Sequence, residues 1–364
     1  MVSGDRTWYH RSVTQLRIRT VDDEVGLQQW CVVNSAAFAA DFVALPGDRF
    51  EEVLPALSGP LGGDDIRFLV GLEGFDPVVG VVTWMSIHDN LHLASVRICV
   101  HPDHRRRGLG REGVSAALEL VRSSGRPTVL AEIPTRTRTT DPSPGTGLAE
   151  SLGFEPKLAQ TRRMLDLREL APERVQQLRA ASKRAAEGYS LLTWIDRAPE
   201  AHRADLAVLH AGMSTDAPQG DLPVEPESWD VARYVDWEVS IVRRRIRQLV
   251  VAVRHDASGQ VVGYSTIGIP PGETDVAFQW DTIVRADHRG HRLGMLLKTS
   301  NLEELARDQP QVRYVNTWNA DDNTHMIAVN EALGYTILGQ PATEWRLEVA
   351  AVLGEQALAG RASI

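Results

Sequence analysis

The sequence predicts an α+β protein built from two tandem domains, each with a mixed, mostly antiparallel central sheet flanked by helices. Three short landmarks recur in the same order at nearly constant offsets of 183 (78 to 261), 184 (100 to 284) and 181 (152 to 333). The landmarks are "VVG" at 78–80 and 261–263, "VHPDHRRRGLG" at 100–110 with "VRADHRGHRLG" at 284–294, and "LGF" at 152–154 with "LGY" at 333–335. Constant offsets of this kind indicate an internal duplication. A chain of 364 residues is long enough to give each copy its own core.

The first copy shows strand and helix periodicities in a regular order. The expected elements are a strand at 15–21, a mainly helical segment at 22–42, a hairpin of 66–72 and 78–87, a strand at 92–100, a helix at 106–125 with a glycine-rich start, and a strand at 127–133. The order is therefore antiparallel hairpins followed by β–α–β.

The second copy repeats this order. Its expected strands are 188–195, 249–255, 261–269, 275–284 and 313–318, and its helices are 290–308 and 323–335. Between the copies, residues 168–187 are rich in Ala, Arg and Gln and predict a polar linking helix. We therefore divide the chain into a domain at 1–167, a linking helix at 168–187 and a domain at 188–364.

Composition narrows the class of protein. The chain is 43% hydrophobic and 24% charged, with a formal net charge of −9. A general nucleic-acid binder would carry a basic domain, so none is expected as a partner. Without a long apolar stretch or a signal peptide, a cytoplasmic protein with no membrane partner is expected. The two cysteines and the scattered histidines show no metal-ligand spacing.

The repeated phrase has the parts of an anion site. A strand leads through a short basic turn into a helix N-terminus, where free main-chain N–H groups and the helix dipole attract negative charge. Glycines allow close approach of a phosphate, and flanking arginines add charge-assisted hydrogen bonds. The segment 105–110 contains all of these features, and 289–294 contains most of them.

Arg105, Gly108 and Gly110, followed by "LGF" about forty residues later, resemble the acetyl-CoA signature of the GNAT superfamily of N-acetyltransferases. The second copy matches the signature at Arg289 and Gly294, with Arg292 at the first glycine position. The layout is similar to that of actinobacterial-type tandem members of the superfamily, such as mycothiol synthase. The resemblance covers both copies and implies two GNAT-like domains.

By this resemblance, acetyl-CoA is the cofactor, and strands ending at Val100 and Val284 splay from the next strand to hold its pantetheine arm. The implied cofactor-binding residues are Cys99, Val100, Arg105, Arg106, Arg107, Gly108, Leu109 and Gly110 in the first copy, and Ile283, Val284, Arg289, Gly290, His291, Arg292, Leu293, Gly294, Asn319 and Asn323 in the second. At Arg292 either the loop shifts or the guanidinium itself binds a phosphate. We favour the second alternative because guanidinium is a good bidentate phosphate partner.

The family resemblance also implies an Asn early in the last helix and a Tyr seven residues later, which protonates the departing thiolate. The second copy has Asn323 and, at the Tyr position, Asn330, which can only donate a hydrogen bond. The first copy has Pro142 and Ala149 there. We therefore expect the second copy to be catalytic and the first to be degenerate or structural, with CoA binding there left open.

Amine acetylation also needs a group that removes a proton. Asp281, three residues before Val284, is the expected general base, and its alternative reading is a plain hydrogen-bond acceptor. In the first copy His88, His92 and Glu132 are the corresponding candidates.

An insert at 213–240 carries acidic and aromatic residues, which suit a cationic amine. Its expected substrate contacts are Asp216, Trp229, Tyr234 and Glu238; a solvated loop leading into an amphipathic helix is the alternative.

The expected activity is direct transfer of an acyl group from acetyl-CoA to the primary amine of a small molecule, a metabolite or an antibiotic-like amine. Two alternatives stay open, a protein N-terminal or lysine acetyltransferase and a non-catalytic acyl-CoA-binding module. The chain is expected to be a monomer or a homodimer.

Overall fold

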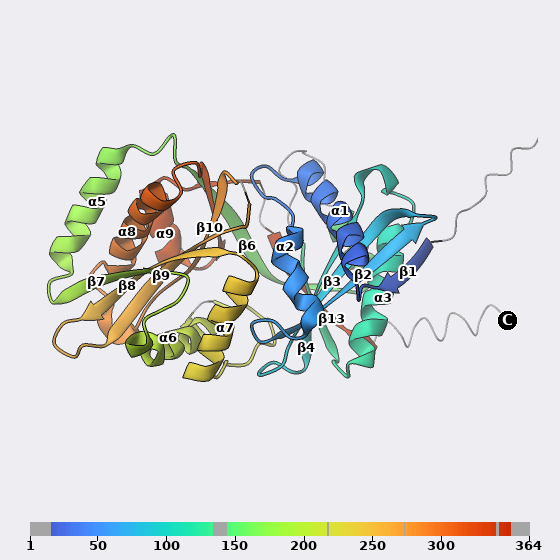
Figure 1. The fold of residues 1–364 in the computed structure, drawn as a ribbon, viewed down its shortest axis with the longest axis horizontal. Helices are drawn as coiled ribbons and strands as arrows, with labels where there is room; N and C mark the ends of the chain where they lie inside the picture. The colour runs from blue at the N-terminus through green and yellow to red at the C-terminus, as the bar shows by residue number, and fades with distance from the viewer. Residues whose placement is uncertain (1–15, 134–143, 217, 273, 340–341, 351–364) are drawn as a thin grey trace, which may run out of the picture.

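A computed structural model describes residues 16–133, 144–216, 218–272, 274–339 and 342–350 of the chain. The described strands form one continuous sheet in the order β1-β2-β3-β4-β5-β13-β6-β11-β10-β9-β8-β7, with β12 paired to β6. The sheet runs through both halves of the molecule, and helices lie on its two faces (Figure 1). No helix among the described residues combines the length and the apolar character needed to cross a bilayer.

The first copy has the expected elements. Its strands are β1 (Leu16–Thr20), β2 (Asp64–Glu73), β3 (Asp76–Ser86), β4 (Leu93–Val100) and β5 (Thr128–Ile133), and its helices are α1 (Glu24–Asp41), α2 (Phe50–Val53), α3 (Leu109–Ser123) and α4 (Pro144–Ser151). β4 and β5 are parallel and joined by α3, whereas β1 to β4 are antiparallel. The expected α+β class is therefore confirmed in this half.

The second copy repeats the arrangement after the linking helix α5 (Pro172–Ala185). Its strands are β7 (Tyr189–Ile195), β8 (Arg247–His255), β9 (Val261–Ile269), β10 (Val276–Val284) and β11 (Tyr314–Ala320), and its helices are α6 (Arg203–Asp216), α7 (Val231–Arg243), α8 (Leu293–Asp308) and α9 (Thr324–Leu333). β10 and β11 are the parallel pair, joined by α8.

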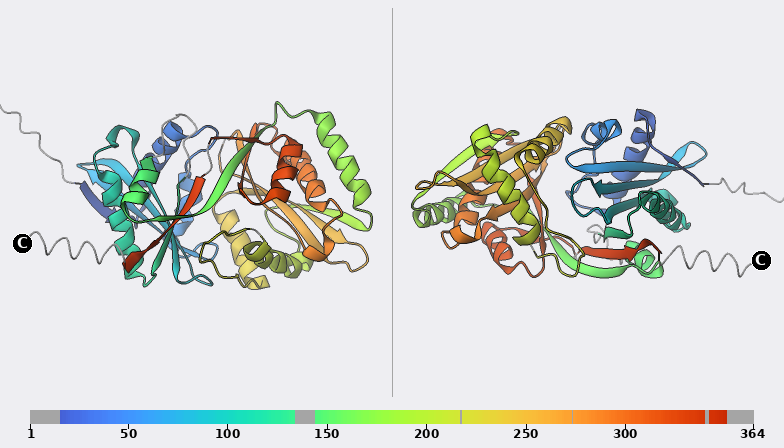
Figure 2. Two further views of the ribbon diagram at one scale, coloured as in Figure 1. Left: turned by 180° about the vertical axis from the view of Figure 1, so that it is seen from behind. Right: turned by 90° about the horizontal axis from the view of Figure 1, so that it is seen from below.

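Three further strands, β6 (Glu155–Asp166), β12 (Thr336–Ile337) and β13 (Ala342–Glu348), join the two copies. β6 leaves the first copy and pairs with β11 of the second, with Thr161 opposite Asn319. β13 returns from the second copy and lies between β5 and β6, with Glu344 opposite Glu132. Both strands can be followed across the middle of the molecule (Figure 2). Each copy therefore completes its sheet with a strand of the other.

The helices cover opposite faces of the sheet. Val81 packs in the core cluster of α3, whereas its neighbour Val82 packs in the cluster of α1. Since alternate side chains of a strand point to opposite faces, α1 and α3 lie on opposite sides. In the second copy, Val250 packs against α6 and α7, and Val251 packs against α8. We call the face that carries α1, α6 and α7 the first face, and the face that carries α3 and α8 the second face.

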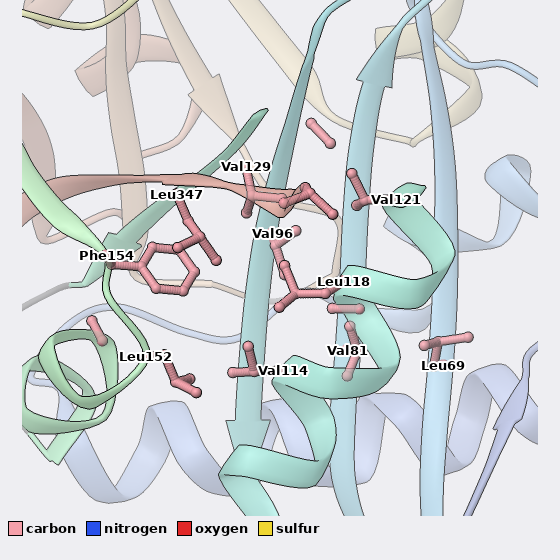
Figure 3. Packing of buried hydrophobic residues seen from close by; sticks show 14 of the residues in the cluster. Leu69, Val81, Val96, Val114, Leu118, Val121, Val129, Leu152, Phe154 and Leu347 are labelled. Carbon is pink, nitrogen blue, oxygen red and sulfur yellow. The ribbon is translucent and has the colours of Figure 1, made fainter. Parts of the chain in front are cut away.

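The core of the first copy contains residues from the C-terminal strand. Leu347 of β13 is buried beside Phe154, Val129 and the apolar side of α3 (Figure 3). Trp345 is also buried there. Burying a Leu side chain stabilises the fold by about 1.5–3 kcal/mol, so β13 contributes directly to the stability of the first copy.

Both parallel pairs separate towards their C-terminal ends. β10 and β11 are paired only from Val276 to Phe278 on the β10 side, and a register irregularity between Gln279 and Thr282 shifts the rest of β10 against β9. β4 and β5 are paired only from Leu93 to Ser95 on the β4 side. Beyond these points the strands splay, and the opening between β10 and β11 is called the wedge below.

Candidate active site

The two basic loops have the same backbone conformation, although their glycines differ. Gly108 and Arg292 occupy the same position, directly before α3 and α8, with φ of +83° and +53°. Two residues earlier, Arg106 and Gly290 have φ of +62° and +88°. Each loop therefore needs two left-handed residues, and each places a glycine at only one of them. The substitution at Arg292 leaves the loop conformation unchanged.

The loop of the second copy presents free main-chain donors. Within the described part of the chain, no group accepts a hydrogen bond from the N–H groups of residues 290–294. No heavy atom lies within 4 Å of the position that a Cβ on Gly294 would take. At its counterpart Gly110, the side chain of Leu148 lies 3.2 Å from that position. The second loop is thus an open anion cradle.

The arginines of the two loops differ in how they are engaged. Arg105 and Arg289 each donate from Nε to the carbonyl oxygen of the residue that ends the preceding strand, Val100 or Val284, at 3.2 Å. The Arg105 guanidinium makes two 2.8 Å bonds to Asp41, and Arg289 makes one 2.6 Å bond to Asp216.

Arg107 is paired with Glu73 at 2.7 Å. The side chain of Arg292, by contrast, is exposed and makes no hydrogen bond or ion pair with any described residue. Among these residues, each loop therefore keeps one guanidinium free to bind a phosphate, Arg106 in the first and Arg292 in the second.

One cavity of about 1720 Å³ joins the second loop to the space between the copies. Its wall includes Arg289, Gly290, Arg292, Leu293 and Gly294, then the edges of the wedge at 278–284 and 317–320, and then residues of the first copy on the first face of the sheet. Cys99, Val100 and residues 105–110 are not part of this wall. The cavity therefore opens onto the second loop and not onto the first.

The wall of the cavity on the first face is aromatic. Its aromatic side chains are Phe38, Phe42, Trp84, Trp237, Phe278, Trp280 and Trp318. Trp280 lies over Gly268, where an added Cβ would be 2.4 Å from its ring, so only glycine fits beneath it. Aromatic faces of this kind attract cations as well as apolar groups.

Charges in the wall are divided between the two ends. Three ion pairs neutralise six of the charged residues, namely Arg97–Asp48, Arg244–Glu52 and Arg289–Asp216. Among the described residues, the remaining acids Asp281, Glu132 and Glu344 have no salt-bridge partner. Two of the remaining cations, Arg292 and Lys298, lie on α8 or its loop. Within this described wall, the loop end therefore carries unpaired cations, and the end between the copies carries Glu132 and Glu344 together with Arg162, which bonds to Asn316 and main-chain oxygens.

Asp281 lies at the register irregularity of β10 and lines the cavity. Its Oδ2 accepts a 3.2 Å hydrogen bond from the hydroxyl of Tyr264, which is itself buried against the ring of His210. Burial raises the pKa of Asp281 above its usual range, although the Tyr264 hydrogen bond opposes this. A carboxylate with a raised pKa at this place is chemically suited to accept a proton.

Glu132 and Glu344 form an acidic pair. They lie opposite each other on β5 and β13 and line the same cavity. Burial and the nearby charge of Glu132 raise the pKa of Glu344 to about 7. Of the other first-copy candidates, His92 contacts the carbonyl oxygen of Pro223 at 2.8 Å, and neither it nor His88 lines the cavity.

Asn323 and Asn330 of the second copy lie at different places relative to the cavity. Asn323 caps α9 by accepting a bond from the N–H of Met326 and lines the cavity. Asn330 is fully buried, donates to Asn319 at 2.7 Å, and is not part of the wall. Asn319 lines the cavity in front of it, so Asn330 supports Asn319 and does not face the cavity.

Of the residues expected to contact a substrate, only Asp216 lines the cavity, where it is paired with Arg289. Tyr234 and Trp229 pack around His210, and burial lowers the pKa of this histidine to about 3. Glu238 is 1% exposed and accepts a hydrogen bond from the N–H of Ala198. These three side chains turn inward because they lie on the apolar side of the insert, and Trp237 lines the cavity instead.

Several wall residues were not found from the sequence. Glu344 and Arg162 come from the exchanged strands β13 and β6, whose partners no local pattern encodes. Lys298 does have a signal, because it is a charged residue on the side of α8 that carries Met295 and Leu302. A lysine at a core-facing helical position is unusual.

Comparisons with known proteins agree with the repeated loops. A family model described as "Acetyltransferase (GNAT) domain" matches residues 64–156, and one described as "Acetyltransferase (GNAT) family" matches residues 216–335. No curated protein matches the chain.

Among solved structures, a tandem GNAT protein from the clavulanic acid biosynthesis pathway is similar, with a TM-score of 0.74 and 27% identity over 92% of this chain and 99% of that one. A GCN5-related N-acetyltransferase from Sphaerobacter thermophilus has a TM-score of 0.62 and 17% identity, over 92% and 96% of the two chains. A putative acetyltransferase from Pyrococcus horikoshii has a TM-score of 0.54 and 14% identity, over 95% of this chain and 92% of that one. The last two show a shared fold. With a GNAT model matched in each half and the same fold in a tandem relative, the chain belongs to the GNAT superfamily and is a tandem-domain N-acetyltransferase.

Proposed function

We propose that the protein transfers an acetyl group from acetyl-CoA directly to the primary amine of a small molecule, and that the second copy carries out the reaction. One observation carries this proposal. A single cavity connects the open anion cradle at 290–294, through the wedge, to an aromatic and acidic chamber between the copies. A volume of about 1720 Å³ exceeds that of ordinary ligand pockets, which suits a cofactor and an acceptor together.

The residues present fit acetyl-CoA at the second loop. The N–H groups of 290–294 and the free guanidinium of Arg292 would hold the pyrophosphate. The separated edges of β10 and β11 would take the pantetheine arm, with Ile283, Val284 and Asn319 along it. The cofactor supplies an activated thioester carbonyl. Cys99, Val100 and the loop 105–110 belong to a similar cradle that does not reach this cavity.

The chamber fits an amine on the acceptor side. Asp281 lies at the wedge and would take the proton that an ammonium must lose before it attacks a carbonyl carbon. The surrounding tryptophans exclude water and stabilise a cationic group. The walls of the chamber come from both copies, and an acceptor must enter between them to reach the wedge, which favours a small molecule over a folded protein as acceptor.

The test compares equivalent glycines of the two loops. Gly294→Glu places a carboxylate at the cradle without a steric clash, so it should abolish CoA binding in calorimetry and acetyl transfer in a thiol-release assay with a panel of amines. Gly110→Glu, at the equivalent position of the first loop, is the matched control and should retain most of the activity. Loss of activity in Gly110→Glu with normal turnover in Gly294→Glu would move catalysis to the first copy.

A further inference from the structure

Lys298 is a buried lysine in the wall of the cavity. It lies on α8, and its side chain is 2% exposed. Its ammonium makes no hydrogen bond or salt bridge with any described residue, and its nearest aromatic neighbour is the ring of Tyr335, with Nζ 5.5 Å from the centroid. Its Nζ atom has no hydrogen-bond partner among the described residues, but it is not fully enclosed by protein atoms.

Helix geometry places this side chain at the wedge. Lys298 is one turn after Gly294 and one turn before Leu302, which packs with Ala277 of β10 and Val315 of β11. Asn301, on the adjacent side of α8, donates to the carbonyl oxygen of Ser265 on β9. Leu302 therefore faces the paired part of β10 and β11, and Lys298, one turn closer to the start of α8, faces the cavity wall beyond it, towards the end where the two strands separate.

A lone ammonium in this position is expensive to bury. Desolvation lowers the pKa of Lys298 to about 7. The titratable groups on the elements around it are Asp281 on β10, His325 in the first turn of α9, Tyr335 after α9, and Arg179 on α5, which pairs with Glu303 of α8. None of them makes an ion pair with Lys298. An apolar side chain would fill the same place at lower cost, so a buried ammonium here is best explained by a partner that binds in the cavity.

We propose that Lys298 contacts the sulfur atom of the cofactor and donates a proton to it when the acyl carbon–sulfur bond breaks. This role rests on the proposed function, because it requires acetyl-CoA in the wedge. Asn330 cannot take this role, because it is buried behind Asn319 and lies outside the cavity wall.

The step balances in atoms and electrons. The Nζ–H bond of Lys298 breaks and an S–H bond forms, while the electron pair of the broken carbon–sulfur bond stays on sulfur. The neutral amine then regains a proton through water from the carboxyl of Asp281, which holds the proton that the attacking nitrogen lost. An ordinary thiol has a pKa of about 8.5, so proton transfer to its thiolate from a lysine that titrates near 7 is downhill.

The test measures the thiol of bound CoA, without turnover. The ultraviolet absorbance of the thiolate is followed against pH for CoA bound to the full-length wild-type protein and to Lys298→Met and Lys298→Arg. A cation beside the sulfur stabilises the thiolate, so in Lys298→Arg, whose guanidinium stays charged, the bound thiol should titrate about one pH unit or more below free CoA. In the wild-type protein the shift should be smaller, because Lys298 itself loses its proton near pH 7. In Lys298→Met this shift should disappear.

Desulfo-CoA, which lacks the sulfur, is the matched ligand and should bind the wild-type protein and both variants with equal affinity in calorimetry. Equal thiol titration in Lys298→Arg and in Lys298→Met would overturn the role of Lys298 and leave the proposed function standing. If Lys298→Met does not fold, an unshifted thiol in the Lys298→Arg complex overturns the role by itself. Failure of the wild-type protein to bind CoA would overturn the proposed function, and this role with it.

Discussion

Arg292 occupies a backbone conformation that costs an ordinary residue about 1–2 kcal/mol, because its Cβ crowds the backbone at positive φ. The first loop carries the same cost at Arg106 and a glycine at 108. An arginine that tolerates this strain, and whose exposed side chain has no partner among the described residues, is suited to bind a phosphate.

We therefore expect Arg292→Gly to raise the free energy of unfolding by about 1 kcal/mol through relief of this strain. The same variant should weaken CoA binding roughly tenfold, because a charge-assisted contact is lost. Thermal unfolding and calorimetry with CoA measure the two effects. Arg106→Gly, at the other strained position, should stabilise the fold without changing CoA affinity. An unchanged affinity in Arg292→Gly would show that the guanidinium does not clamp the phosphate.

The buried Lys298 makes the free energy of unfolding depend on pH. Its pKa is about 7 in the folded protein and 10.5 in the reference state, so between these values the unfolded chain binds more protons. The free energy of unfolding should therefore rise with pH in this window, by up to about 1.4 kcal/mol per pH unit from this group. Lys298→Met should be more stable than the wild-type protein at pH 7, and the difference should shrink towards pH 10.5. Denaturant titrations at several pH values measure it.

For single residues, the sequence predicts a role where the neighbouring positions along the chain determine the surroundings. The loop residues Arg289 and Gly294 are recognisable because a strand and a helix flank them within a few positions. Glu344 and Lys298 are different, since their surroundings are assembled from segments far apart in the chain. Glu238 shows the same limit, because its acidic type indicates exposure and only its packing shows that it is buried.

Among the elements, β13 connects the end of the chain to the core of the first copy. Leu347→Ala should lower the free energy of unfolding by about 2–5 kcal/mol, because it leaves a cavity between β13 and α3. Ile337→Ala on β12, where the side chain is 58% exposed, is the control and should cost less than about 0.5 kcal/mol. Chemical denaturation measures the free energy of unfolding of both variants. Similar losses for both variants would show that β13 is not a core strand.

The hairpins and the β–α–β units are predictable because their periodicity and turns are local. The starts and ends of β3, β4 and α8 agree with the expected segments to within a few residues. β6 and β13 were not predicted, since their partners lie in the other copy and alternation alone does not say with which strand a segment pairs. Residues 135–147 were expected to resemble a loop more than a helix start. Residues 135–143 lie outside the described part of the chain, and for 144–147 the expectation is wrong, because they form the first turn of α4.

At the scale of the whole molecule, the duplication was predictable and the shared sheet was not. The repeated landmarks imply two similar units, whereas the exchange of β6 and β13 makes each unit depend on the other. The division at 167 and 188 remains a prediction about the sequence repeats. The cavity between the copies follows from the exchange, since Glu344 reaches it on β13 and Arg162 on β6.

We expect that neither 1–168 nor 169–364 folds when expressed alone, because the first fragment leaves β5 and β6 without β13 between them and the second leaves β11 without β6. Co-expression should restore a folded complex of the two fragments. Circular dichroism and size-exclusion chromatography measure this. A cooperatively unfolding, monomeric 1–168 fragment would contradict the expectation.

The position of β13 also orders events during synthesis. The ribosome releases β5 more than two hundred residues before β13, which ends at Glu348. At roughly 5–20 residues per second, the unfinished first copy must wait on the order of ten seconds or longer for its missing strand. Through that interval the edge of β5 has no partner and is open to pairing with other nascent chains. The last strand of the described residues to be made is therefore the one that closes the first domain, so a chain that is interrupted before β13 leaves the first domain without its closing strand.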